Sequence, residues 1–225
     1  MRLSATNIAD YLSCPQKFYY RLKSKQEDTP ALIYGRNFHT VLENYRKTWG
    51  SLEEAYDLYS YMFDDKNKFS KDLKVFLVNF SNLVDTNSMS ESTFDLPTKY
   101  DDVFLVGKID CINSSGYVID WKTGFVKKDL SANVQGIIYS HAYKEWFGKK
   151  PNKVMFCSMK TGEIIEYRDD PVFSNYLLND VIDDIVKNYS GQSLLRSGIY
   201  NNICSSCLFK NICYKELGKT SFLDY

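Results

Sequence analysis

One stretch constrains the fold more than any other: residues 103–124, with the sequence VFLVGKIDCINSSGYVIDWKTG. Two segments rich in Val, Ile and Phe flank Asn-Ser-Ser-Gly, which predicts two antiparallel strands joined by a tight turn. Gly116 suits the left-handed position of a three-residue loop. If that loop is residues 114–116, Asn113 pairs with Tyr117 and Asp110 lies opposite Asp120.

This register places four charged residues on one face of the hairpin, because side chains alternate along a strand. They are Lys108, Asp110, Asp120 and Lys122. Carboxylates directly opposite each other are unfavourable unless a cation lies between them, and oxygen ligands of this kind suit Mg²⁺ or Mn²⁺. The alternative is an exposed hairpin with two acids and two lysines. A two-residue loop would also separate the two carboxylates onto opposite faces.

Composition limits the classes of protein that the chain can be. The 225 residues are 44% hydrophobic, which is enough for one sizeable core. The 28 basic and 28 acidic residues balance, so any contact with DNA must come from a local basic groove. No apolar run is long enough to span a bilayer and the first residues are not a signal peptide, so we expect a cytoplasmic protein without membrane contact.

Basic and aromatic residues alternate in the helix predicted from residue 16 to about residue 25. This pattern suits nucleic-acid backbone and bases, although ordinary amphipathic helices show it too. The candidate DNA-binding residues are Lys17, Arg21, Lys23 and Lys25.

Further candidate residues lie on predicted helices and on one short strand. His39 and Glu43 are four residues apart and share a helix face, although a lone helical His is usually structural. Glu91 opens a short extended segment before the hairpin. Gln135 and Tyr139 lie one turn apart on the helix that follows it, where Tyr139 could equally be a core residue. Between residues 51 and 86, two helices with a 3.6-residue apolar period carry no evident chemistry.

Cysteines mark a second candidate site. Cys204, Cys207 and Cys213 form a Cys-x2-Cys-x5-Cys pattern, and three cysteines so close together indicate a metal. Three ligands do not close a site, and Cys14 is the evident fourth. Thiolates bind zinc and iron–sulfur clusters alike, so the chemistry of the ligands leaves both open. We expect the other two cysteines, in strands, to be core residues.

The hairpin motif resembles a known family. Gly107-x2-Asp110 followed by Asp120-x-Lys122 is similar to the core of PD-(D/E)XK nucleases, in the RecB-like branch. That branch includes CRISPR-associated RecB-like exonucleases and AddB-type nuclease domains. Residues 4–20, with a Cys-Pro pair, resemble the opening of its iron–sulfur members. The resemblance extends from residue 4 to residue 213, with the motifs in the expected order.

The resemblance implies a role for each candidate residue. The metal ligands would be His39, Asp110, Asp120 and the backbone carbonyl of Trp121. Lys122 would stabilise charge on the phosphoryl oxygens or orient the attacking water. Substrate would be positioned by Gln135, Tyr139 and Glu91, with Glu43 supporting the metal ligands. A 4Fe–4S cluster would be held by Cys14, Cys204, Cys207 and Cys213.

Together these observations predict an α/β fold, a central mixed β-sheet flanked by helices in a restriction-endonuclease-like core. We expect a single domain over residues 1–225, with a helical insertion at about residues 50–88 and termini stapled by metal. The predicted function is metal-dependent DNA exonuclease activity with Mg²⁺ or Mn²⁺. The alternative is a non-catalytic DNA-end or partner-binding module of a CRISPR-adaptation or recombination complex. A purely structural metal protein would leave the paired carboxylates and Lys122 unexplained.

Overall fold

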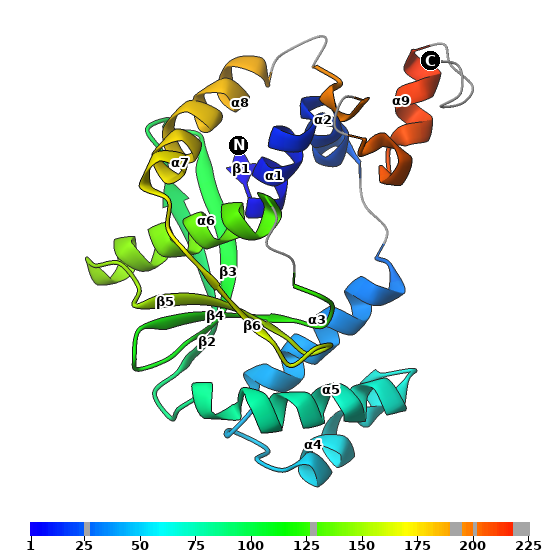
Figure 1. Cartoon of the computed structure of the whole chain (residues 1–225), viewed down its shortest axis with the longest axis vertical. Helices are drawn as coiled ribbons and strands as arrows, with labels where there is room; N and C mark the ends of the chain where they lie inside the picture. The colour runs from blue at the N-terminus through cyan, green and yellow to red at the C-terminus, as the bar shows by residue number, and fades with distance from the viewer. Residues whose placement is uncertain (25–27, 127–129, 190–194, 200–201, 218–225) are drawn as a thin grey trace. The chain divides into compact units, whose positions relative to one another are not determined.

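The computed structural model describes residues 1–24, 28–126, 130–189, 195–199 and 202–217. The chain divides into two compact units. The first comprises Met1–Arg2 and Glu27–Asp169, and the second comprises Leu3–Gln26 and Asp170–Tyr225. Figure 1 labels their elements.

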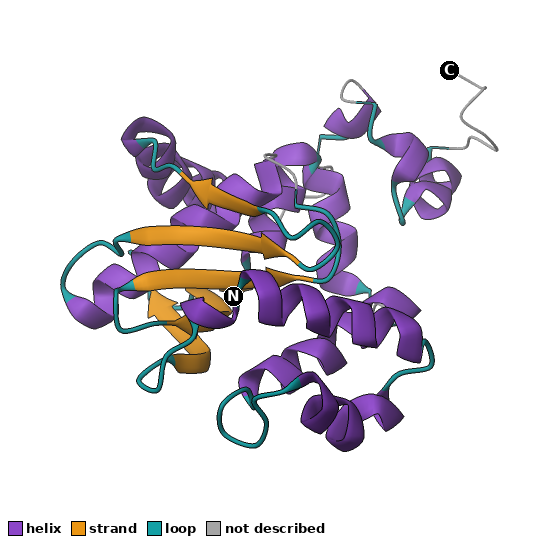
Figure 2. Ribbon diagram, turned by 60° about the horizontal axis from the view of Figure 1, so that its bottom comes forward, coloured by secondary structure: helices purple, strands orange, loops and turns teal. Residues whose placement is uncertain are grey.

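A six-stranded mixed sheet is the centre of the first unit, as the sequence predicts. The strands are β1 (Arg2–Leu3), β2 (Met89–Pro97), β3 (Phe104–Ile112), β4 (Tyr117–Lys122), β5 (Lys153–Ser158) and β6 (Ile164–Tyr167). Their order is β1-β3-β4-β5-β6, and β2 also pairs with β3. Strands β4 and β5 are parallel, whereas β2–β3, β3–β4 and β5–β6 are antiparallel. Figure 2 shows these strands side by side in orange.

The β3–β4 hairpin has the predicted register. Cys111 pairs with Ile119, and the Asn113 N–H donates to the Tyr117 carbonyl over 3.1 Å. Gly116 has φ +72°, the left-handed conformation that a three-residue loop requires. The two-residue loop is therefore wrong, and the two aspartates lie at facing positions where the strand pairing ends.

Helices cover both faces of the sheet (Figure 1). One layer contains α3 (Pro30–Glu43), α4 (Leu52–Tyr59) and α5 (Lys66–Asn79), with the 3-10 turns η1 (Ser60–Met62) and η2 (Ser81–Leu83). The two helices predicted between residues 51 and 86 are thus confirmed. Their aromatic side chains pack on Trp121 of β4, with the Phe76 ring edge-on at 5.6 Å. Cys111 and Cys157 are buried in the same core, as expected.

Helix α6 (Leu130–Phe147) is the crossover between the parallel strands β4 and β5. Gly136 lets this helix approach the sheet closely, because an added Cβ would lie 2.4 Å from the Tyr167 ring. The neighbouring Gln135 and the buried Tyr139 are therefore held close to β4.

The second unit is built from an N-terminal segment and a C-terminal segment of the chain. Its elements are α1 (Ala5–Ser13), α2 (Pro15–Lys23), α7 (Pro171–Tyr176), the π-helix η3 (Leu177–Val181), α8 (Ile182–Asn188), η4 (Ser197–Ile199), η5 (Cys204–Ser206) and α9 (Lys210–Glu216). Ser4 caps α1 as predicted, accepting a hydrogen bond from the Asn7 N–H. The Tyr20 and Phe209 rings, from opposite ends of the chain, pack 5.8 Å apart. None of the helices described is both long enough and apolar enough to cross a membrane.

Candidate metal and catalytic centre

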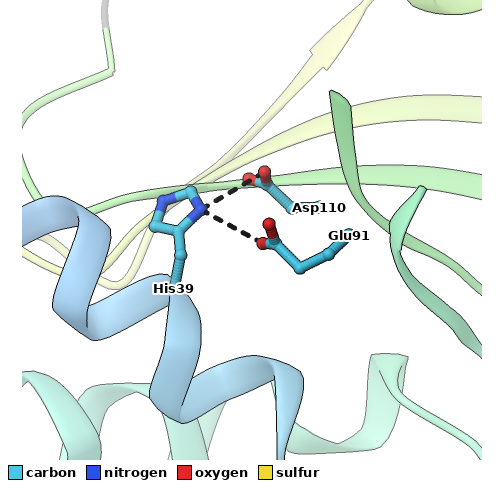
Figure 3. Close-up of side chains that lie close together, drawn as sticks. All are labelled: His39, Glu91 and Asp110. Atoms are coloured by element: carbon cyan, nitrogen blue, oxygen red, sulfur yellow. Dashed lines mark ion pairs between the residues drawn. The ribbon is translucent and has the colours of Figure 1, made fainter. Parts of the chain in front are cut away.

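Three side chains from three elements of the first unit converge on one point. His39 of α3 places Nδ1 3.2 Å from an Asp110 Oδ1 on β3 and 3.7 Å from a Glu91 Oε1 on β2. One ligand atom from each residue lies within 4.8 Å of the others. Figure 3 shows both carboxylates directed at the same imidazole nitrogen. One imidazole and two carboxylates are a suitable ligand set for a divalent metal.

Glu91 has an unusual backbone conformation within strand β2. Its φ is +52°, whereas the flanking Ser90 and Ser92 pair regularly with Cys111 and Ile109 of β3. A residue other than glycine in this left-handed region costs about 1 to 3 kcal/mol and tends to occur at functional sites. Glu91 lies with His39 and Asp110 in one group of candidate metal ligands, whereas the sequence predicted that Glu91 would position substrate. No local signal in the sequence identifies this conformation.

The two oxygens of Asp110 have different partners. Oδ1 faces His39, while Oδ2 accepts the Trp121 backbone N–H over 2.7 Å and joins β3 to β4 beyond their paired residues. Burial alone would lower the pKa of His39. The hydrogen bond to Asp110, the charges of Asp110 and Asp120 and a hydrogen bond to the Trp121 backbone outweigh burial and raise that pKa. The Trp121 backbone, a predicted metal ligand, thus lies beside the imidazole.

A hydrogen-bond network surrounds Asp120, whose side chain is 3% exposed. Gln135 Nε2 donates to Asp120 Oδ1 over 2.8 Å, and the Tyr139 hydroxyl lies 3.0 Å from the same oxygen. The Lys122 ammonium lies 2.7 Å from Asp120 Oδ2 and donates to Gln135 Oε1 over 2.9 Å. Gln135 and Tyr139, both predicted to position substrate, therefore contact Asp120 directly, and Gln135 also contacts Lys122.

The electrostatics of Asp120 favour a bound cation. Burial raises the pKa of Asp120, the Lys122 charge lowers it, and the Asp110 charge raises it further. Within the described part of the chain, Lys122 is the charged partner of Asp120 Oδ2, 2.7 Å away. Two acidic side chains, one of which raises the pKa of the other, favour a cation between them. A divalent metal close to Asp110 and His39 would supply that cation, so the residues present fit such an ion.

Two other residues near the centre differ in their contacts. Lys108, which the sequence placed on the polar face without a role, forms an ion pair with Glu91, and its side chain is 48% exposed. Glu43 is the last residue of α3, and no ion pair connects it to His39 among the described residues. Sequence reasoning therefore missed Lys108, which lies beside the three candidate ligands.

The basic helix α2 of the second unit contacts a buried acid. Lys17 Nζ lies 2.6 Å from Asp10 Oδ1, and Arg21 donates to Asp10 Oδ2. Lys23 donates to the Tyr19 hydroxyl, and Lys25 lies outside the described residues. Lys17 and Arg21 thus have a structural role that the sequence pattern did not indicate, while DNA contact by this helix stays a prediction.

The four predicted cluster ligands line one cavity of the second unit. They are Cys14, Cys204, Cys207 and Cys213. Burial raises the pKa of Cys204, and the charges of the other three thiols raise it further. Arg196 Nε donates to Cys213 Sγ over 3.3 Å. Among the described residues, no three of these sulfur atoms lie within 4.8 Å of one another, so the 4Fe–4S cluster stays a prediction.

Comparison with known proteins agrees with this geometry. The family model described as the PD-(D/E)XK nuclease superfamily matches residues 2–214. The chain therefore belongs to the PD-(D/E)XK nuclease superfamily, as the hairpin motif predicts. No curated protein sequence gives a significant match.

A solved structure shows the same fold, and a second one is less similar. A candidate exonuclease from Eubacterium rectale is 14% identical, with a TM-score of 0.58 over 88% of this chain and 85% of that one. SSO0001 is 16% identical, with a TM-score of 0.46 over 94% of this chain and 85% of its own. The first of these supports the restriction-endonuclease-like fold of the sheet and its helices.

Proposed function

We propose that this nuclease-superfamily member is a metal-dependent DNA nuclease that acts as an exonuclease. The observation that carries the proposal is the buried carboxylate of Asp120, which lies beside the Lys122 ammonium and within the electrostatic influence of Asp110 and His39. A chain that only bound DNA would have no need to bury this carboxylate beside Lys122.

The residues of the centre would have separate roles in the reaction. His39, Asp110, Asp120 and the Trp121 carbonyl would hold Mg²⁺ or Mn²⁺, with Glu91 beside them. The bound ion would polarise the phosphate and lower the pKa of the attacking water. The Lys122 side chain is 37% exposed, and its ammonium would stabilise charge on the phosphoryl oxygens.

We further propose that Gln135 and Tyr139 are positioning residues. The Gln135 amide spans Lys122 and Asp120, so one side chain sets the separation of the lysine from the carboxylate. Tyr139 fixes the same carboxylate from within the core. Burial, together with the charges of Asp120 and Asp110, raises the pKa of Tyr139 well above its ordinary value, so its hydroxyl stays a donor.

A cleavage assay tests the proposed function. Single- and double-stranded DNA labelled at one end would be incubated with Mn²⁺ and wild-type protein, Asp120→Ala, Lys122→Ala or the exposed control Lys144→Ala. We expect both site variants to lose cleavage and Lys144→Ala to keep it. Asp120→Ala should also weaken Mn²⁺ binding in calorimetry, whereas Lys122→Ala should retain it because lysine is not a ligand. Cleavage by Lys122→Ala at the wild-type rate would refute the mechanism.

We also propose that the four cysteines hold a 4Fe–4S cluster. Their location on one cavity of the second unit supports this. Such a staple would close the loop between Cys14 and Cys204 and would remove several kcal/mol of unfolded-chain entropy.

The cluster has its own test. Anaerobically purified protein should be brown and contain iron and sulfide. Cys14→Ser should lose the colour and melt at a lower temperature, whereas the buried control Cys157→Ser should keep the colour. Stoichiometric zinc without iron would reject the cluster, and full metal content in Cys14→Ser would reject the staple.

The biological setting that we propose rests on the family resemblance. DNA with single-stranded regions or free ends would be the substrate, and proteins of CRISPR adaptation or recombination would be the partners. Recovery of such proteins with the tagged chain, from cells that express it at its natural level, would test this setting.

A further inference from the structure

A cavity of about 460 Å³ in the first unit shares two elements with the candidate centre. It lies between the first half of α3, the segment before α5 and the residues that follow β4. Asn37 lines it two residues before His39, and Thr123 lines it directly after Lys122. Two walls of the cavity therefore belong to the elements that carry the metal ligand and the lysine.

The lining suits a flat, largely apolar group. Volumes of about 300 to 1,000 Å³ are usual for small-molecule sites, so one nucleoside fits. The Tyr34 and Phe63 rings lie edge to face at 5.2 Å, and Ile33 adds aliphatic surface that is 45% exposed. Asn37 Nδ2 donates to the Met62 carbonyl over 2.7 Å, and no described residue donates to its amide oxygen. That oxygen is a suitable acceptor for a base amino group.

The charges of the cavity disfavour a phosphate. Asp64 and Asp65 both line it. Its cation, Lys68, is paired with Asp72 and lies over the Tyr34 ring at 3.6 Å. A phosphate would therefore meet two carboxylates and an ammonium that is already neutralised. A neutral base avoids this repulsion and buries its apolar surface against the lining.

We propose that this cavity binds one unstacked nucleobase of the DNA strand whose phosphate lies at the candidate centre. The inference rests on the proposed function and adds a substrate class to it. A base inside the cavity is neither stacked nor paired with a second strand. The preferred substrate is therefore single-stranded DNA or a frayed end.

Abasic oligonucleotides provide the test, because they remove one base and keep the phosphates. A series of fluorescent single strands, each with one abasic nucleotide, would be titrated with wild-type protein in EDTA, where cleavage is blocked. Contact of one base with aromatic side chains is worth about 1 to 3 kcal/mol, so one position should weaken binding by about 5- to 150-fold. The other positions should change the affinity little. A blunt duplex should bind more weakly than the single strand.

Two substitutions on α3 test whether the base at the sensitive position of the DNA strand is the one bound in the cavity. Ala31 is exposed and lines the cavity, so Ala31→Trp should fill it and abolish the dependence on position. Leu32 is 54% exposed and lies outside the lining, so Leu32→Trp should keep that dependence. Ile33→Trp is a second filling variant, and circular dichroism would confirm that each protein folds.

The outcomes separate this inference from the proposed function. A flat abasic profile for a wild-type protein that cleaves DNA with Mn²⁺ would overturn the base site alone. A profile that Ala31→Trp and Ile33→Trp leave unchanged would also overturn it. A position-dependent profile in a protein that cleaves no DNA would support the base site and overturn the nuclease.

Discussion

The hydroxyl of Tyr139 offers the sharpest test of how the candidate centre is held together. This buried side chain is 4% exposed, and its ring lies edge-on to Phe94 at 6.3 Å. The hydroxyl accepts from Gln135 Nε2 at 2.7 Å and lies 2.9 Å from the Lys108 carbonyl and 3.0 Å from Asp120 Oδ1. Tyr139→Phe removes this oxygen and leaves the ring in place.

The expected effects can be worked out from these contacts. The Lys108 carbonyl and Asp120 Oδ1 would both lose this donor, and an unsatisfied buried acceptor costs about 1 to 3 kcal/mol. A change of 1 kcal/mol shifts the melting temperature of a chain of this size by about 2–4 °C, so Tyr139→Phe should melt about 2–12 °C lower. Asp120 would keep Gln135 and Lys122 but lose one of its positioning contacts. Losing such a contact typically costs about 10- to 100-fold in metal affinity, so the Mn²⁺ dissociation constant should rise by that factor.

The assay compares two tyrosines on one helix. Tyr143→Phe is the matched control, because Tyr143 is buried one turn further along α6 and its hydroxyl lies against Gly116 at the hairpin turn. Thermal melts and Mn²⁺ calorimetry would be run on both variants. Wild-type stability and Mn²⁺ affinity in Tyr139→Phe would show that the hydroxyl does not hold Asp120. Equal losses in Tyr143→Phe would show that the effect is not specific to the centre.

Two further predictions concern packing and charge. Gly107→Ala should lower the free energy of unfolding by about 1 to 3 kcal/mol, because its Cβ would lie 2.4 Å from the Phe94 ring. Gly124→Ala should be close to neutral in the same urea titration, since nothing lies within 4 Å of its added Cβ. Lys17→Gln should destabilise the protein by about 1.5 to 3 kcal/mol, because buried Asp10 loses one of its two cations. The salt dependence of DNA binding tests the predicted DNA contact of the same residue: a shallower slope in Lys17→Gln would support that contact, and an unchanged slope would leave Lys17 with its structural role alone.

The sequence by itself determined the features that depend on local periodicity and turn chemistry. Alternation in the strands and the left-handed requirement at Gly116 specified the hairpin register, and with it the facing positions of Asp110 and Asp120. The 3.6-residue apolar period located α4 and α5 because one helical face must pack against the sheet. These features involve residues close together in the chain, so their geometry could be predicted without knowing the tertiary structure.

Only the tertiary structure decided which distant side chains meet. The left-handed conformation of Glu91 is visible only in the tertiary structure, since glutamate has no intrinsic preference for it. The bonds from Gln135 and Tyr139 to Asp120 depend on how closely α6 crosses the sheet, which Gly136 permits. Lys17 seemed equally suited to solvent or DNA until the fold placed it beside Asp10. A side chain's partner depends on the path of the whole chain, whereas periodicity describes only one element at a time.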